Sequence, residues 1–158
     1  MAHQQKDLEL LNGSLNGEYF GIAAYQAALD SGLLTEGVKP VALKFQSDHK
    51  AHAGLYRKEI LALKGTPVET KTWAQYAAAS PPPPLKTQED VLRYAATLES
   101  GAASNTLATV ARFSSPRLAG LAASIVGVEA MHWAVLRNAL GEDPVPVSVI
   151  AGAEIVEK

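Results

Sequence analysis

The chain lacks cysteine entirely and contains only two methionines among its 158 residues. Without cysteine there are no disulfide bonds, thiolate metal sites or thiol catalysis, although this absence does not decide the cellular compartment. The low methionine count disfavours a helical carrier of haem or lipid. The formal net charge is only −2, which argues against a nucleic-acid-binding protein that neutralises phosphates.

The sequence also has no obvious targeting segment. Residues 1–11 read MAHQQKDLELL and contain no apolar signal stretch. No apolar run is expected to approach the length that a bilayer requires. We therefore expect a cytoplasmic protein without a membrane partner, unless a leader precedes this sequence.

The residues that are present predict a single all-α domain over 1–158. The chain is long enough to bury a substantial core, and its richness in alanine and leucine favours helix. Apolar residues recur at steps of three and four, which predicts helices at about 4–29, 36–64, 87–113 and 116–140. The tail, 142–158, contains two prolines and is predicted to be an extended arm.

Local signals indicate where these helices begin and end. Glycines follow three of the four periodic stretches and predict their ends at Gly32, Gly65 and Gly141. Residues 87–90 form a variant capping box with Asp in the usual Glu position. Ser115-Pro116 predicts an N-cap followed by proline at the first helical position.

The segment 65–86 differs from the helices around it. Trp73 to Tyr76 can form a short helical turn, whereas Pro81 to Pro84 must be extended. Both flanking helix pairs are needed to complete one core, so the segment is predicted to be a crossover and not a linker. The sequence therefore predicts an antiparallel four-helix bundle with one long crossover between its second and third helices, as in ferritin-like bundles.

A pattern of acidic and imidazole residues occurs twice in the sequence. The first positions are 81 residues apart, and the second and third positions are each 80 apart. All six residues fall on the predicted buried stripe of a helix, where a charged group costs several kcal/mol unless it is paired or bound to metal. The first set is Glu18, His49 and His52, and the second is Glu99, Glu129 and His132.

Height along the predicted helices supports a common location for the six residues. Each lone glutamate lies roughly 12–14 residues before its helix ends, and each pair lies roughly 14 residues after its helix begins. Residues at i and i+3 share a helical face, so both members of a pair can reach one point. Carboxylate oxygen with imidazole nitrogen suits iron, manganese or zinc. The alternative is a bundle whose buried Glu and His side chains bind only each other and water.

The order of these residues resembles the ferritin-like di-iron superfamily, in particular its stress- and desiccation-related branch. The resemblance covers about residues 5–141. It implies a carboxylate-bridged centre of two iron or manganese ions, with zinc as a further candidate. It also implies oxidation of Fe(II), or reduction of peroxide or dioxygen.

One position departs from the family pattern. By position, Glu18 and Glu99 match the lone carboxylates, but His49 stands where the family has glutamate. The neighbouring Asp48 shares a face with His52 and is an alternative ligand. His49 is preferred because it continues the buried stripe and matches Glu129 in the repeat.

Two functions therefore follow as expectations. The first is a di-metal protein with ferroxidase- or peroxidase-like activity in stress protection, whose partners are metal ions and a small oxidant. The second is a metal-poor or metal-free bundle with a structural or partner-binding role. By analogy with such bundles, a homodimer is a further expectation. Catalytic residues, substrate and reductant do not follow from the sequence.

Overall fold

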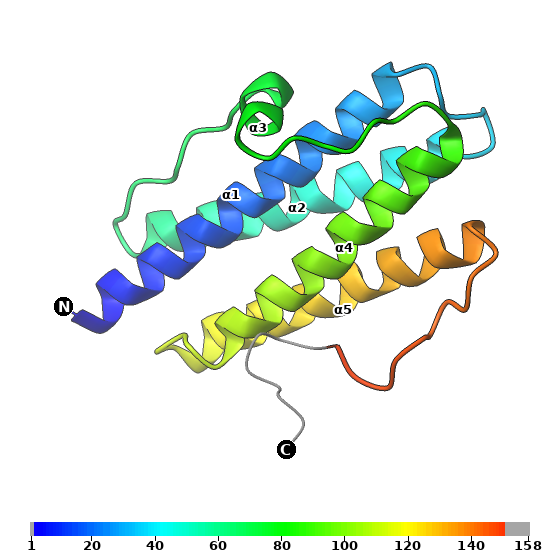
Figure 1. The fold of residues 1–158 in the computed structure, drawn as a ribbon. Coiled ribbons are helices and arrows are strands. Elements are labelled where there is room, and N and C mark those ends of the chain that lie inside the picture. The colour runs from blue at the N-terminus through cyan, green and yellow to red at the C-terminus, as the bar shows by residue number, and fades with distance from the viewer. Residues whose placement is uncertain (1, 151–158) are drawn as a thin grey trace. The chain divides into compact units, whose positions relative to one another are not determined.

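The computed structural model describes residues 2–150, and these form five helices and no strand (Figure 1). The predicted all-α class is therefore observed for the described part of the chain. Residue 1 and residues 151–158 lie outside this description, and they include the second half of the predicted C-terminal arm. The helices are α1 (Ala2–Asp30), α2 (Lys39–Ala62), α3 (Trp73–Ala79), α4 (Gln88–Val110) and α5 (Pro116–Ala139).

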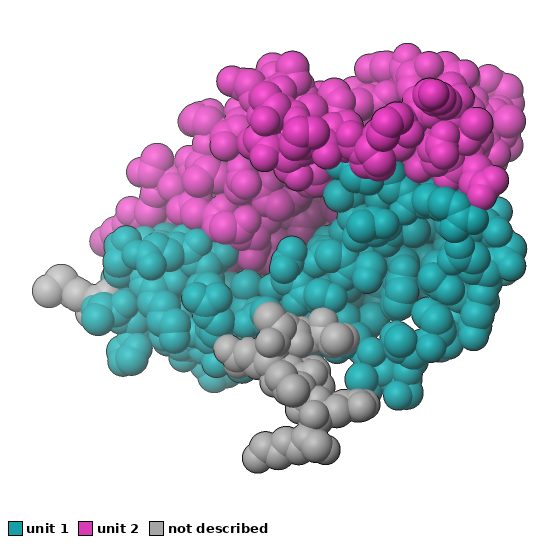
Figure 2. Space-filling view, viewed as in Figure 1, with its two compact units in different colours: residues 1–10, 92–158 teal, residues 11–91 magenta. Residues whose placement is uncertain are grey.

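The chain divides into two compact units (Figure 2). Unit 2 comprises residues 11–91 and holds most of α1, all of α2 and α3, and the first turn of α4. Unit 1 comprises residues 1–10 and 92–158 and holds the first turns of α1, the rest of α4, and α5.

In unit 2, α1 and α2 run side by side in opposite directions. The side-chain amide nitrogen Nε2 of Gln46, early in α2, donates to the Ile22 carbonyl (3.2 Å) late in α1. Asn12, early in α1, instead accepts a hydrogen bond from the Val68 amide (2.8 Å), just beyond α2. The core between these helices includes the fully buried Leu11, Leu15, Tyr56 and Ile60.

The connection between α2 and α4 is held along α1 by specific contacts. The Tyr76 hydroxyl donates to Asn16 Oδ1 (3.3 Å), and the Tyr76 ring packs edge-on against Phe20 at 5.3 Å between centroids. The predicted turn at Trp73 is the helix α3. A capping box between Thr72 and Gln75 begins this helix.

In unit 1, α4 and α5 are antiparallel neighbours joined by a short turn. Arg93, early in α4, forms an ion pair with Glu142 (2.5 Å), just after α5 ends. At the other end, the Ser114 amide in the turn donates to Asp7 Oδ1 (2.7 Å). Arg137 also pairs with Glu142 (2.9 Å), which fixes the start of the arm.

Helix α5 is long and apolar enough to cross a membrane, the one such helix in the described residues. The expectation that no apolar run reaches this length is therefore wrong. The reason is that α5 carries no charged side chain between Arg117 and Glu129. Core helices of soluble proteins can meet the same criteria of length and composition. Helix α5 buries Glu129 and His132 on one side.

The helix starts partly follow the sequence signals. The predicted box at α4 is confirmed, because the Thr87 amide donates to Asp90 Oδ2 (2.9 Å) and the Asp90 amide donates to Thr87 Oγ1 (3.1 Å). Ser115 is the N-cap of α5, but its side chain makes no capping hydrogen bond. The second helix begins at Lys39 and not at 36, because residues 36–38 form a turn that leaves Pro40 in the first helical turn.

The helix ends show one clear difference from the prediction. Gly32 and Gly141 adopt the predicted left-handed conformation, with φ of 72° and 73°. After α2, however, the left-handed residue is Lys64 (φ 58°), not Gly65. The Gly65 amide then donates to the Ile60 carbonyl (2.9 Å), which completes a Schellman motif. The third long helix ends at Val110, three residues before the predicted end at 113.

Candidate metal centre

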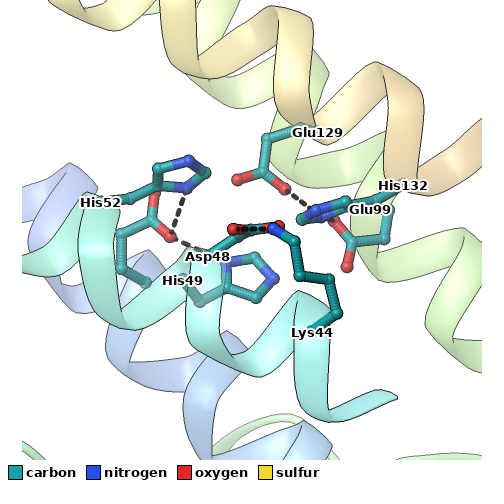
Figure 3. A network of polar contacts seen from close by, with 8 residues as sticks. Lys44, Asp48, His49, His52, Glu99, Glu129 and His132 are labelled. Carbon is teal, nitrogen blue, oxygen red and sulfur yellow. Dashed lines mark hydrogen bonds and ion pairs between the residues drawn. The ribbon is translucent and has the colours of Figure 1, made fainter. Parts of the chain in front are cut away.

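Three of the six predicted ligands meet in unit 2. Glu18 extends from α1, and His49 and His52 extend from α2 (Figure 3). His49 Nδ1 lies 2.8 Å from Glu18 Oε2, and His52 Nδ1 lies 3.5 Å from the same oxygen. All three side chains are buried. Two imidazoles therefore share one carboxylate, and we call these residues the unit 2 cluster.

The charge of Glu18 is set by these two histidines. Burial by itself raises the pKa of this carboxyl, because a charge is poorly solvated inside the protein. Hydrogen bonds from His49 and His52, together with their electrostatic attraction, outweigh burial and hold the pKa of Glu18 below its ordinary value. The carboxylate is therefore ionised at neutral pH, which is the form that ligates a cation.

The imidazole of His49 is held by its neighbours on α1. A Cβ atom built on Gly21 would lie 3.0 Å from His49 Cε1 and Nδ1 and 3.1 Å from Cδ2. The ring thus lies flat against the glycine backbone. The Tyr25 ring packs against it at 5.6 Å between centroids. These contacts and the Glu18 hydrogen bond fix the ring orientation, and Gly21 and Tyr25 are therefore part of the site's framework.

Asp48 is placed differently from His49. It forms an ion pair with Lys44 one turn earlier in α2, and its side chain is partly exposed (Figure 3). His49 is buried in contact with Glu18. Of the two alternatives that the sequence leaves open, His49 is the residue in the unit 2 cluster.

The other three predicted ligands meet in unit 1. Glu99 extends from α4, and Glu129 and His132 extend from α5 (Figure 3). His132 Nδ1 lies 3.3 Å from Glu99 Oε2 and 3.8 Å from Glu129 Oε2. Both carboxylates are only 1% exposed. Here two carboxylates share one imidazole, and we call these residues the unit 1 cluster.

Each cluster has the donor chemistry of a metal site. In each, every residue offers one ligand atom, and these atoms lie within 4.8 Å of one another. The donors are carboxylate oxygens and imidazole nitrogens, which suit divalent iron, manganese and zinc. The residues present therefore fit a metal ion in each cluster.

The sequence pattern identified all six of these residues but not Gly21. A glycine inside a helix costs about 1 kcal/mol relative to alanine, but Gly13 and Gly17 lie in the same helix without a close neighbour, so this cost alone does not single out Gly21. The internal repeat gives a further signal. The position 81 residues after Gly21 is Ala102, so only the half with the third histidine has glycine there.

Comparison with known proteins identifies the family. The family model of the ferritin-like domain matches residues 6–142. The chain belongs to the ferritin-like domain family. The match includes both clusters and all five helices except the first four residues of α1. Among curated proteins, none matches this sequence significantly.

Solved structures show the same fold at low sequence identity. A conserved hypothetical protein from Mycobacterium tuberculosis aligns with a TM-score of 0.77 and 18% identity, over 93% of this chain and 99% of that one. A ferritin-like, diiron-carboxylate protein from Bacillus anthracis strain Ames aligns with a TM-score of 0.72 and 20% identity, over 89% and 99%. The ferritin-like fold predicted from the sequence is therefore observed.

Proposed function

We propose that this ferritin-like protein binds two metal ions, iron or manganese, through the unit 1 and unit 2 clusters. The proposal includes the arrangement that the family resemblance implies, an antiparallel four-helix bundle in which residues 63–87 form the crossover. The observation that carries it is the burial of three glutamates and three histidines in two clusters related by the sequence repeat. The diiron-carboxylate nature of the Bacillus anthracis relative supports it.

The energetics of the unit 1 cluster favour a bound cation. Glu99 and Glu129 are both 1% exposed, and one imidazole, His132, lies within 4 Å of both. A buried carboxylate costs several kcal/mol unless opposite charge compensates it. A divalent cation compensates the charge of both carboxylates, which is the physical reason why such a cluster favours metal binding.

The proposed chemistry is redox turnover of iron or manganese with a small oxidant. Oxidation of two ferrous ions by one hydrogen peroxide consumes two protons and yields two ferric ions and two waters, so electrons and atoms balance. The role of the protein is to hold the ligands in place and to keep bulk water away from them. The burial of all six side chains serves this role. Stress protection is the corresponding physiological proposal, in keeping with the branch that the sequence resembles.

The donor set determines which oxidation state is favoured. Three glutamates contribute a charge of −3 against +4 from two divalent ions, whereas a fourth glutamate would complete the balance. His49 removes that fourth charge. We therefore propose that the resting protein holds divalent ions, with one hydroxide supplying the remaining negative charge.

A second function has one specific observation in its favour. Glu18 already accepts a hydrogen bond from His49, and His52 Nδ1 lies 3.5 Å from the same carboxylate oxygen, so the charge of Glu18 can be compensated without a cation. A bundle that binds little metal and acts through protein partners is consistent with this network. Metal content separates the two functions.

The test is metal content and thermal stability of purified protein. The full chain is prepared without chelator, and a second sample is stripped with EDTA and titrated with Fe(II) without oxygen or with Mn(II). About two ions per chain are expected. At a metal concentration of 100 times Kd, one bound ion adds about 2.7 kcal/mol. For a chain of this size that raises Tm by roughly 5–11 °C.

A matched histidine pair controls this experiment. His132→Ala removes a proposed ligand and should abolish metal retention at unit 1, whereas His3→Ala removes an exposed histidine that forms a hydrogen bond with Ser114. The His3 variant should retain metal like the wild type. Loss of Fe(II) oxidation by peroxide in the His132 variant alone would link activity to the cluster. If the wild type holds no metal and its Tm is unchanged by added ions, the metal-free function is favoured.

A further inference from the structure

Unit 2 contains a groove that is lined by none of the unit 2 cluster residues. Its walls come from α1, from α2 and from residues 70–73, and its volume is about 650 Å³. Helix α3 and the residues before it lie beside α1, which is how they reach the groove (Figure 1). Small-molecule sites typically have volumes of about 300–1,000 Å³, so the groove has the size of a ligand site.

Four polar side chains of α1 and α2 form a continuous row of hydrogen bonds along this groove. Lys50 Nζ donates to Gln46 Oε1 (2.7 Å), and Gln46 Nε2 donates to Gln26 Oε1 (3.0 Å). Gln26 Nε2 donates to Asp30 Oδ1 (3.0 Å). Gln46 is only 3% exposed and also donates to the Ile22 carbonyl, so its side chain is fixed between the two helices. This buried glutamine therefore holds the Lys50 ammonium group at the groove.

Two lysines give the groove an excess of positive charge. Lys50 belongs to α2 and Lys71 to the segment before α3, and Asp30 is the one carboxylate among the described residues that line the groove. Within the described part of the chain neither lysine forms an ion pair, because Lys50 contacts the neutral Gln46 and Lys71 lies 5.8 Å from the centre of the Tyr76 ring. An ammonium group has three donors, so both lysines can still bind an anion.

Aromatic and apolar side chains complete the groove beside these charges. Trp73 lines it, and the Trp73 ring is held against Phe20 at 5.9 Å between centroids. Tyr19 and the apolar Ile22 and Ala23 line it from α1. Aromatic side chains bind the rings of ligands by stacked or edge-on contacts. The combination of fixed ammonium groups with aromatic surface therefore fits a ring that carries an acidic group.

We propose that this groove binds small aromatic anions, with the acidic group bound by Lys50 and Lys71 and the ring packed against Trp73. Aromatic carboxylates and aromatic phosphate esters share this chemistry. The site goes beyond the proposed metal function and does not depend on it, because no residue of either cluster lines the groove.

The two tryptophans of the chain, Trp73 and Trp133, provide a test with an internal control. The full chain is titrated at constant ionic strength with benzoate, phenyl phosphate, inorganic phosphate or benzylamine, and the two indole N–H resonances are followed by NMR. Trp133→Phe assigns the two resonances. Benzoate and phenyl phosphate should shift the Trp73 resonance saturably, with a Kd of about 10 mM or tighter, and leave that of Trp133 unchanged. The tighter of these two ligands identifies the preferred acidic group.

The remaining probes separate the two parts of the proposed ligand. Inorganic phosphate has the charge without the ring and should bind more weakly than phenyl phosphate. Benzylamine has the ring with a positive charge and should not bind at the lysines. Equal responses to benzoate and benzylamine, or no saturable shift of the Trp73 resonance with either aromatic anion, would overturn the proposal.

Lysine variants test the role of charge. Lys50→Gln and Lys71→Gln should each weaken benzoate binding by roughly threefold to fivefold, the effect of one solvent-exposed ion pair. Both lysines are exposed, so these substitutions leave the core intact. Lys58→Gln is the matched control, because Lys58 is an exposed lysine of α2 outside the groove, and it should keep the wild-type Kd. Benzoate binding that is unchanged when both groove lysines are replaced would overturn the proposal, whatever the metal content of the protein.

Discussion

The unit 1 and unit 2 clusters come from one repeated pattern but differ in the partners that surround their buried carboxylates. In unit 2, two imidazoles surround a single carboxylate, and hydrogen bonds lower the pKa of Glu18. In unit 1, two carboxylates share His132, with longer separations of 3.3 and 3.8 Å. The two clusters therefore combine carboxylates and imidazoles in opposite ratios.

The surroundings of the two clusters differ in the same way. Next to His49, the unit 2 framework contains Tyr25, with Phe45 and Tyr56 among the buried residues of α2. The corresponding residues of unit 1 are Thr106 (offset 81) and Ile125 and Leu136 (offset 80). Aromatic rings thus accompany the unit 2 cluster, and smaller aliphatic or hydroxyl side chains accompany the unit 1 cluster. A repeat can therefore keep ligand positions while its packing and its donors change together.

The largest expected effect is on the free energy of unfolding of metal-free protein, which should change in opposite directions when one carboxylate is neutralised in each cluster. Glu129→Gln removes one of two buried carboxylates and should raise the free energy of unfolding by about 1–3 kcal/mol. Glu18→Gln removes the acceptor charge shared by two imidazoles and should lower it by about 1 kcal/mol. Urea unfolding in EDTA measures both. Effects of the same sign would show that the two clusters do not differ in charge compensation.

A smaller effect is expected at the C-terminal ends of α2 and α5, where the two halves use different residues. Lys64 has φ 58°, a conformation that costs a non-glycine residue about 1–2 kcal/mol. Lys64→Gly should therefore raise the free energy of unfolding by up to about 1 kcal/mol, after allowance for the greater freedom of glycine in the unfolded chain. Lys64→Ala is the control and should give no such gain. Gly141→Ala should lower the free energy by about 1 kcal/mol, and stabilisation by that change would contradict the argument.

The smallest effect is expected for Asp48, the residue next to the ligand His49. Asp48→Asn weakens the ion pair with Lys44, which is worth about 0.3–0.5 kcal/mol on a helix surface. Metal content should stay at the wild-type value, whereas His49→Ala should reduce it. Elemental analysis of the two variants decides which residue corresponds to Glu129. Metal loss in the Asp48 variant would reverse the assignment.

Much of the fold could be predicted because its signals are local. The three-to-four periodicity identified the four long helices, and the Thr87–Asp90 box appeared as expected. Errors occurred where several conformations satisfy the same local rule. Gly65 was the expected end of α2, but the Schellman motif closes one residue earlier with Lys64 in the left-handed position. The expectation that no apolar run is long enough to cross a membrane was wrong for α5, because its small apolar residues, with few interspersed charges, make the whole helix apolar.

The amino-acid sequence by itself determined the helical class, the repeat and which six acidic and imidazole residues are buried, because each depends on spacing along a regular helix. Only the tertiary structure decided that two imidazoles share Glu18 and that the His49 ring lies against Gly21. These outcomes depend on how α1 and α2 approach each other within a few ångströms. The periodicity of either helix alone does not contain that distance.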